Sequence, residues 1–377
     1  MHCTLRRTLF VCLFAALFLP LVAYGECLDG VHSGGSAKYR ICMPAAGAWN
    51  GDLIIFAHGY VAPGEPVAIP ESQLRLPDGT ELPTLITNLG FAFATTSYRR
   101  NGLVAPDGVV DIVDLVEVFK SAQGVPRRIF VTGASEGGLV AVKALEQYPG
   151  TFHGALAACG PIGDFRRSMD HIGNLRVVFD YFFPNLLPPS AISIPDSLMA
   201  GWESYYKPRV LAALNRQPLA TAQLISVTNL PVGLNPANIG DAVTSVLWYN
   251  VFATNDAIAQ LGGNPFDNKN RWYSGSLFDL LLNLRVARFR ADKAALDEIE
   301  AHYQTSGRLP RPLITLHTTA DPVVPYWHET LYAQKAAAAS SSHMLIQIPV
   351  LRYGHCNFSA AEVVGSFLLL VYHPLAQ

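Results

Sequence analysis

The stretch Gly133-Ala134-Ser135-Glu136-Gly137-Gly138 lies between a β-type run, Arg128–Thr132, and a helical run that is closed by Pro149-Gly150. A serine flanked by glycines between a strand and a helix is typical of a nucleophile elbow, because this tight turn has no room for larger side chains. Such a turn projects the serine hydroxyl from the end of a sheet. The alternative interpretation is a glycine-rich turn whose serine only caps the helix.

β-type and helical runs alternate on both sides of this turn. The β-type runs are Tyr39–Met43, Asp52–His58, Phe91–Tyr98, Arg128–Ser135, Gly154–Gly160, Pro312–Thr318 and His343–Val350. The helical runs are Pro83–Leu89, Asp107–Gln123, Glu136–Tyr148, Trp327–Ala338 and Ala360–Tyr372. This alternation predicts an α/β fold with a mostly parallel sheet and helices on both faces.

Residues 165–308 interrupt the alternation. This block of about 145 residues consists of aromatic and leucine-rich helical stretches separated by prolines, and it is far longer than an ordinary loop. We therefore expect one α/β domain formed by residues 26–164 and 309–377, with a mainly helical insert between them.

Residues 1–25 are predicted to be a secretory signal peptide. Two arginines, Arg6 and Arg7, precede an apolar run, and Ala23-Tyr24-Gly25 supplies the small residues of a cleavage site. An uncleaved membrane anchor is disfavoured, because the run is shorter than the ~20 residues of a spanning helix and contains a proline. We expect cleavage after Gly25, a secreted or periplasmic product, and no membrane span in the mature chain.

Export would leave four cysteines, Cys27, Cys42, Cys159 and Cys356, in an oxidising compartment. Of the three possible pairings, Cys27–Cys42 with Cys159–Cys356 is the most economical, since the first pair closes a short hairpin-like segment. Alternatively, Cys159 is a small buried side chain without a partner. No cysteine or histidine cluster has zinc-ligand spacing, so we expect no metal and no cofactor.

The composition argues against two classes of protein. Half of the 377 residues are hydrophobic and 15% are charged, which argues against a disordered chain. The formal net charge is −2, and no run of like charge occurs. Because phosphate binding needs a basic surface, nucleic acid is not an expected partner.

A serine hydroxyl needs a base that takes its proton and a third group that orients the base. Four histidines follow a candidate acid in the sequence: His328, His343, His355 and His373. Only His355 lies in a loop directly after a predicted strand, where its side chain could reach the serine. The others fall inside a helix, at the start of a strand and at the end of the last helix.

The orienting carboxylate is predicted at Asp321. This residue ends the strand that precedes the strand leading to His355, which satisfies the order Ser, Asp, His. Asp164 is the rival, because it follows the strand after the elbow helix. A turn-forming Asp-Pro sequence would also explain Asp321.

A developing oxyanion needs two preorganised N–H donors. The backbone amide of Glu136 follows the nucleophile directly. The second donor is expected from the loop His58-Gly59-Tyr60, at the amide of Tyr60.

Together these motifs resemble the α/β-hydrolase fold, over about residues 36–164 and 309–377. The resemblance implies a secreted serine esterase or lipase that acts through an acyl-enzyme, with the insert similar to a cap domain. The sequence His-Gly-Tyr-Val departs from the His-Gly-Gly-Gly of the hormone-sensitive-lipase branch. Cys356 is similar to a cysteine of tannase and feruloyl esterase relatives, whose partner precedes the serine. Ala134 stands at that position here, which leaves Cys159 as the candidate.

The insert is rich in aromatic residues, including Trp202, Tyr205-Tyr206 and Trp248-Tyr249. We therefore expect a small-molecule or polymeric carboxylic ester with apolar or aromatic groups as substrate. One alternative is a serine peptidase of prolyl-oligopeptidase type, which shares the triad order although no propeller repeats are visible. The other is a non-catalytic binding protein with the same fold.

Overall fold

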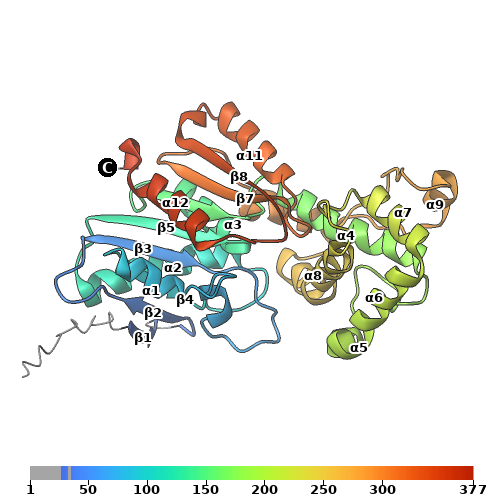
Figure 1. The fold of residues 1–377 in the computed structure, drawn as a ribbon, viewed down its shortest axis with the longest axis horizontal. Coiled ribbons are helices and arrows are strands. Elements are labelled where there is room, and N and C mark those ends of the chain that lie inside the picture. Colours follow the sequence, from blue (N-terminus) through green and yellow to red (C-terminus); the bar gives the residue numbers. More distant parts are fainter. Residues whose placement is uncertain (1–26, 33–34, 377) are drawn as a thin grey trace, which may run out of the picture.

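The computed structural model describes residues 27–32 and 35–376, so the predicted signal peptide lies outside the described residues. A sheet of eight strands in the order β1-β2-β4-β3-β5-β6-β7-β8 crosses the molecule (Figure 1). The strands are β1 (Cys27–Val31), β2 (Lys38–Cys42), β3 (Asp52–Ala57), β4 (Ala92–Thr96), β5 (Arg128–Ala134), β6 (Gly154–Ala158), β7 (Leu313–Ala320) and β8 (Leu345–Tyr353). Strand β2 pairs antiparallel with β1 and β4, and all other neighbours are parallel. The predicted mostly parallel sheet is confirmed.

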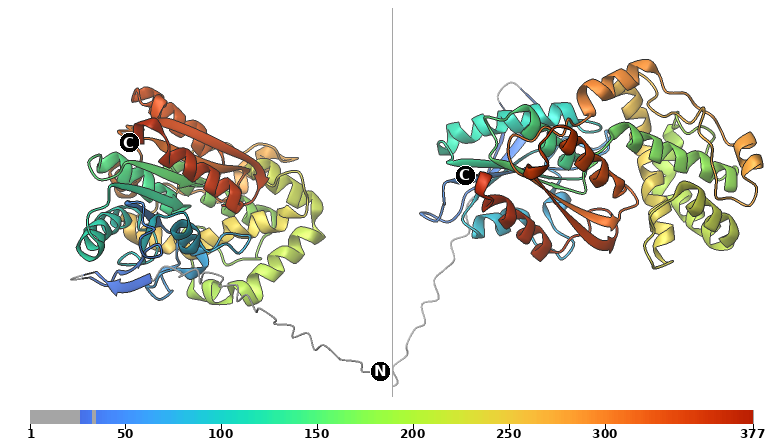
Figure 2. Two further views of the ribbon diagram at one scale, coloured as in Figure 1. Left: turned by 60° about the vertical axis from the view of Figure 1, so that its left-hand side comes forward. Right: turned by 90° about the horizontal axis from the view of Figure 1, so that it is seen from above.

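Helices cover both faces of this sheet (Figure 2). The residues of β3 show why, since Leu53 and Ile55 pack into one apolar layer and Ile54 and Phe56 into the other. The first layer contains α2 (Ala105–Gln123), α3 (Glu136–Gln147) and α11 (Trp327–Ala338); the second contains α1 (Leu82–Asn88), α12 (Ala360–Val371) and the 3-10 turn η1 (Glu71–Leu74). Both faces are therefore buried, which explains why the central strands are apolar without alternation.

Residues 165–308, all of which the structure describes, form helices and loops but no strand. The elements are α4 (Phe165–Phe182), α5 (Asp196–Gly201), η2 (Trp202–Tyr206), α6 (Lys207–Arg216), α7 (Pro218–Thr228), α8 (Asn238–Leu261), α9 (Asp279–Arg285), α10 (Lys293–Glu298) and η3 (Ile299–Tyr303). In the sequence, these elements lie between β6 and β7. In space, α4 to α9 lie beyond one end of the sheet (Figure 1). A separate apolar cluster around Phe179, Trp202 and Leu247 holds these helices together.

One detail differs from the sequence-based prediction. The sequence predicts that His343 opens a strand, but it lies in the 3-10 turn η4 (Ser342–Met344), and β8 begins at Leu345.

The predicted hairpin-like segment at the N-terminal end is confirmed. Cys27 stands directly opposite Cys42 in the pairing of β1 with β2, and the two form a disulfide. A short 3-10 turn, η5 (Pro374–Ala376), ends the described chain. Among the described helices, none has the length and apolar character needed to cross a bilayer.

Candidate active site

Ser135 occupies a sharp turn between β5 and α3. Its φ of 57° and ψ of −125° lie in a region that non-glycine residues rarely adopt. A Cβ atom on Gly137 would lie 2.0 Å from the carbonyl oxygen of Ala57, and one on Gly133 would lie 2.0 Å from the carbonyl oxygen of Gly137. Side chains are excluded at both positions. The glycines on either side of Ser135 are therefore the residues that the predicted elbow requires.

Three side chains from distant parts of the chain form a hydrogen-bonded series at this turn. His355 Nε2 lies 2.8 Å from Ser135 Oγ, and His355 Nδ1 lies 2.7 Å from Asp321 Oδ2. Because an ionised carboxylate only accepts hydrogen bonds, Nδ1 carries the proton and Nε2 is free to accept the serine proton. The structure thus brings together the serine, histidine and aspartate that the sequence singled out.

Backbone amides hold the buried Asp321 carboxylate in one orientation. Its Oδ1 atom accepts hydrogen bonds from the amides of Val323 and Val324, at 2.9 and 3.0 Å. The remaining oxygen, Oδ2, therefore faces His355. The side chain of Asp321 is fully buried, whereas that of His355 is 19% exposed, so the histidine lies between the buried acid and the open site.

The rival residues have other partners. Asp164 caps α4, where its Oδ1 accepts hydrogen bonds from the Arg167 amide and from Gln304 Nε2. His328 is fully buried, and its Nε2 lies 2.9 Å from Ser168 Oγ. Burial lowers the pKa of His328 well below the usual range. These residues stabilise the packing between α4 and α11 and do not reach Ser135.

The loop that follows β3 passes very close to the elbow. A Cβ atom on Gly59 would lie 3.0 Å from Ser135 Cβ and 3.1 Å from the carbonyl oxygen of Ala134, so a larger residue here would crowd the elbow. Gln73 holds the loop from both sides: its Oε1 accepts the Gly59 amide at 2.7 Å, and its Nε2 donates to the carbonyl oxygen of Tyr60 at 3.3 Å. Sequence reasoning missed Gln73, since η1 carries no motif and lies beyond the loop.

Two amides near Ser135 are free to donate. In the part of the chain that the structure describes, the Tyr60 amide has no hydrogen-bond acceptor. Glu136 opens α3, and the first amides of a helix have no partner within the helix. The predicted oxyanion donors therefore lie in the loop and the helix start that flank the serine.

The side chain of Glu136 is a buried acid beside the nucleophile. Burial raises its pKa to about 8, and its Oε1 accepts the Val104 amide at 2.8 Å. Its Oε2 has no hydrogen-bond partner among the described residues. Burial therefore favours the neutral form of this carboxyl in the folded protein.

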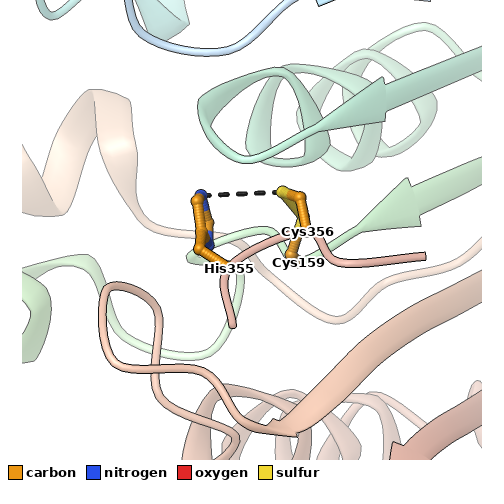
Figure 3. A group of neighbouring side chains, drawn as sticks. All are labelled: Cys159, His355 and Cys356. Atoms are coloured by element: carbon orange, nitrogen blue, oxygen red, sulfur yellow. Dashed lines mark hydrogen bonds between the residues drawn. A yellow bond between two sulfur atoms is a disulfide. The ribbon is translucent and has the colours of Figure 1, made fainter. Parts of the chain in front are cut away.

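A disulfide between Cys159 and Cys356 braces the histidine loop (Figure 3). It connects the segment after β6 to the residue that follows His355, with the two Cα atoms 5.4 Å apart. Cys356 Sγ lies 3.6 Å from His355 Nε2. Although Cys159, Cys356 and His355 present ligand-type atoms to one another, the sulfurs are bonded together and offer no thiolate to a metal.

Two cavities meet at Ser135, and Tyr60 and Tyr249 line both of them. The smaller one, of about 100 Å³, lies between the elbow and the helices α4 and α8. The larger one, of about 380 Å³, extends under η1, α1 and α12. Tyr249 comes from α8 of the insert, and burial raises its pKa to about 12. The sequence marked Trp248-Tyr249 only as part of an aromatic surface.

The strand order, the turn at Ser135 and the helices on both faces of the sheet define the class of fold. The chain has the α/β-hydrolase fold.

Comparisons with known proteins give relatives of several activities. Residues 86–178 match the prolyl oligopeptidase family, a segment that contains Ser135. No curated protein matches the chain. An acylaminoacyl peptidase of Pyrococcus horikoshii is similar to it, with 14% identity, 91% of this chain and 39% of that chain covered, and a TM-score of 0.47. The chain thus spans about two fifths of that peptidase.

Two further solved structures are of similar length to this chain. An esterase of Pyrococcus furiosus has 12% identity and a TM-score of 0.43, with 92% of this chain and 88% of that chain covered. A proline iminopeptidase of Mycobacterium smegmatis has 12% identity and a TM-score of 0.46, with 93% and 99% covered.

Proposed function

We propose that this protein hydrolyses carboxylic esters through an acyl-enzyme intermediate. Ser135 is the nucleophile, His355 the acid and base, and Asp321 the orienting carboxylate. The observation that carries this proposal is the hydrogen-bonded series from the strained serine through His355 Nε2 and Nδ1 to the buried carboxylate. This arrangement supplies the nucleophile, the base and the orienting group of a serine hydrolase.

The reaction has two halves. Ser135 Oγ attacks the ester carbonyl while its proton passes to His355 Nε2, and the carbonyl oxygen becomes an oxyanion facing the amides of Tyr60 and Glu136. The C–O bond then breaks, and His355 gives its proton to the leaving alkoxide. Water next attacks the acyl-serine, and its proton returns to Ser135 through His355. The products are an alcohol and a carboxylic acid.

The walls of both cavities favour esters over peptides. Side chains such as Phe56, Leu156 and Phe358 line the larger cavity, and Met169 and Phe266 line the smaller one. The amides of a peptide substrate would lose hydrogen bonds to water against such walls, whereas an ester with apolar groups would not.

The test is the variant Ser135→Ala, assayed on p-nitrophenyl esters and with a fluorophosphonate probe. We expect turnover and covalent labelling to be abolished. Ser121 on α2 offers a control, because it lines neither cavity and its Oγ donates to the carbonyl oxygen of Glu117; Ser121→Ala should keep both activities. Retained ester turnover in Ser135→Ala would contradict the proposal.

A peptidase is the second candidate, because residues 86–178 match the prolyl oligopeptidase family. A p-nitrophenyl ester and a p-nitroanilide with the same acyl group separate the two. We expect the ester to be the far better substrate; a better anilide would assign the site to peptide bonds. A non-catalytic chain would turn over neither compound.

We further propose that residues 165–308 are a cap over the site and that residues 1–25 direct export. Tyr249 of the insert lines the same two cavities as Ser135, which supports a cap. The two disulfides are compatible with an oxidising compartment. The mass of the protein recovered from the medium or periplasm would reveal cleavage after Gly25.

A further inference from the structure

We infer that the two cavities divide the substrate between them: the larger cavity binds the alcohol group of the ester, and the smaller one binds the acyl group. This inference rests on the proposed ester hydrolysis. It assigns a substrate class, namely esters in which a short acyl group is joined to a bulky apolar alcohol.

Different catalytic groups line the two cavities, and this difference determines how an ester must lie in the site. Ser135 lines both cavities, as expected for the atom that attacks between the two halves of a substrate. His355 lines only the larger cavity, and Glu136 lines only the smaller one. The two sides of the nucleophile therefore differ in the group they present to the substrate.

The chemistry of the second proton transfer decides which half enters which cavity. His355 Nε2 receives the serine proton and must then deliver it to the leaving oxygen. The proton passes only if the leaving oxygen lies within hydrogen-bond distance of His355 Nε2. The leaving oxygen must therefore lie on the His355 side of Ser135. The alcohol that carries this oxygen consequently extends into the larger cavity. The acyl group points away from His355, toward Glu136.

The sizes and walls of the cavities then set the class of each group. At about 380 Å³ the larger cavity falls in the range of small-molecule binding pockets, roughly 300–1,000 Å³. Its walls are largely carbon, from Ile54, Phe93 and Phe367 among others. The smaller cavity, at about 100 Å³, is roughly a quarter of that size and is bordered by Ile172 and Ala253, so it favours the smaller group of the ester.

Tyr249 separates the two spaces. Its side chain borders both cavities beside Ser135, and its ring centroid lies 5.9 Å from that of Tyr60. Tyr60 borders the same junction, and its hydroxyl donates to the carbonyl oxygen of Phe252 at 3.1 Å, which ties the loop after β3 to α8. The rings of Tyr60 and Tyr249 thus lie where the loop after β3 meets α8 of the insert. The division between the two cavities therefore depends on the position of α8.

A matched pair of variants tests the division. Val363→Phe on α12 narrows only the larger cavity, and Ala253→Phe on α8 narrows only the smaller one. Both positions are partly exposed and neither takes part in the chemistry. The substrates form two series, acetate esters of increasingly bulky alcohols and methyl esters of increasingly long acids, followed by acid release in a pH-stat.

The two series should respond in opposite ways. We expect Val363→Phe to lower kcat/KM at least about tenfold for acetates of bulky alcohols but not for methyl acetate, since changes of pocket size typically alter discrimination by this factor or more. Ala253→Phe should do the same for long acyl groups and leave bulky acetates unaffected. Val363→Met and Ala253→Leu serve as milder versions if a phenylalanine lowers the melting temperature.

The outcomes separate this inference from the proposed function. A wild-type protein that hydrolyses no ester and is not labelled at Ser135 would overturn the proposed function. Wild-type ester turnover with the two selectivities exchanged, or with neither variant changing selectivity, would overturn the division of the cavities while leaving ester hydrolysis in place.

Discussion

Replacing Asp321 by asparagine should disable the histidine without disturbing substrate binding. Two backbone amides, those of Val323 and Val324, donate to Oδ1 of the carboxylate. An asparagine must therefore keep its carbonyl oxygen at this position, which places its NH2 group opposite His355 Nδ1. Nδ1 then has to accept, the ring proton moves to Nε2, and the ring presents an N–H to Ser135 in place of a lone pair.

The expected loss is large because the wrong tautomer cannot act as a base. Loss of the orienting carboxylate in a Ser-His-Asp site costs about 10,000-fold in kcat. At about 1.4 kcal/mol for each factor of ten, this is about 5.5 kcal/mol in activation free energy. Since Asp321 lines neither cavity, KM should stay close to the wild-type value.

The assay is steady-state hydrolysis of a p-nitrophenyl ester by the wild type, Asp321→Asn and Asp164→Asn. Asp164 is the matched control, because asparagine also caps a helix and should keep activity within about threefold. More than about a tenth of wild-type kcat in Asp321→Asn would refute the reasoning. An equal loss in Asp164→Asn would move the orienting role to that residue.

Further predictions concern stability. Burial raises the pKa of Glu136 to about 8, above its unfolded value, so its contribution to stability is fully present at low pH and is lost as the pH rises toward 8. The free energy of unfolding by urea should therefore fall with pH by up to about 1.4 kcal/mol per unit more steeply in the wild type than in Glu136→Gln; equal slopes would contradict this. Removing the Cys159–Cys356 disulfide, which joins residues 197 apart, should lower stability by about 5 kcal/mol, against about 3 kcal/mol for Cys27–Cys42 with a separation of 15. Only the former should also lower kcat, because it braces the His355 loop; unchanged kcat in a folded Cys159→Ala/Cys356→Ala variant would argue against bracing.

Local features were predictable because local sterics determine them. The glycines of the elbow are required by contacts of 2.0 Å within the turn and its neighbouring strand, and the flanking apolar runs have the periods of strands and helices. The position of His355 just after β8 followed from the same periodicity. The helical content of residues 165–308 was likewise predictable from apolar spacing and length.

Gln73 and Tyr249 show where sequence reasoning stops. Gln73 acts on a loop 13 and 14 residues upstream, and Tyr249 lines the two cavities at Ser135 from α8 of the insert. Neither residue stands in a motif, because each works through a contact that the chain makes only when it is folded.

The sequence by itself determined the class of fold, the strained serine turn and a short set of candidate partners, since each depends on residues that are neighbours in the chain. Only the tertiary structure brought Asp321, and not Asp164, to His355, and brought His355 to a serine 220 residues away. It also decided the disulfide pairing and the two cavities around Ser135. These features depend on packing between distant segments, which no local pattern of residues encodes.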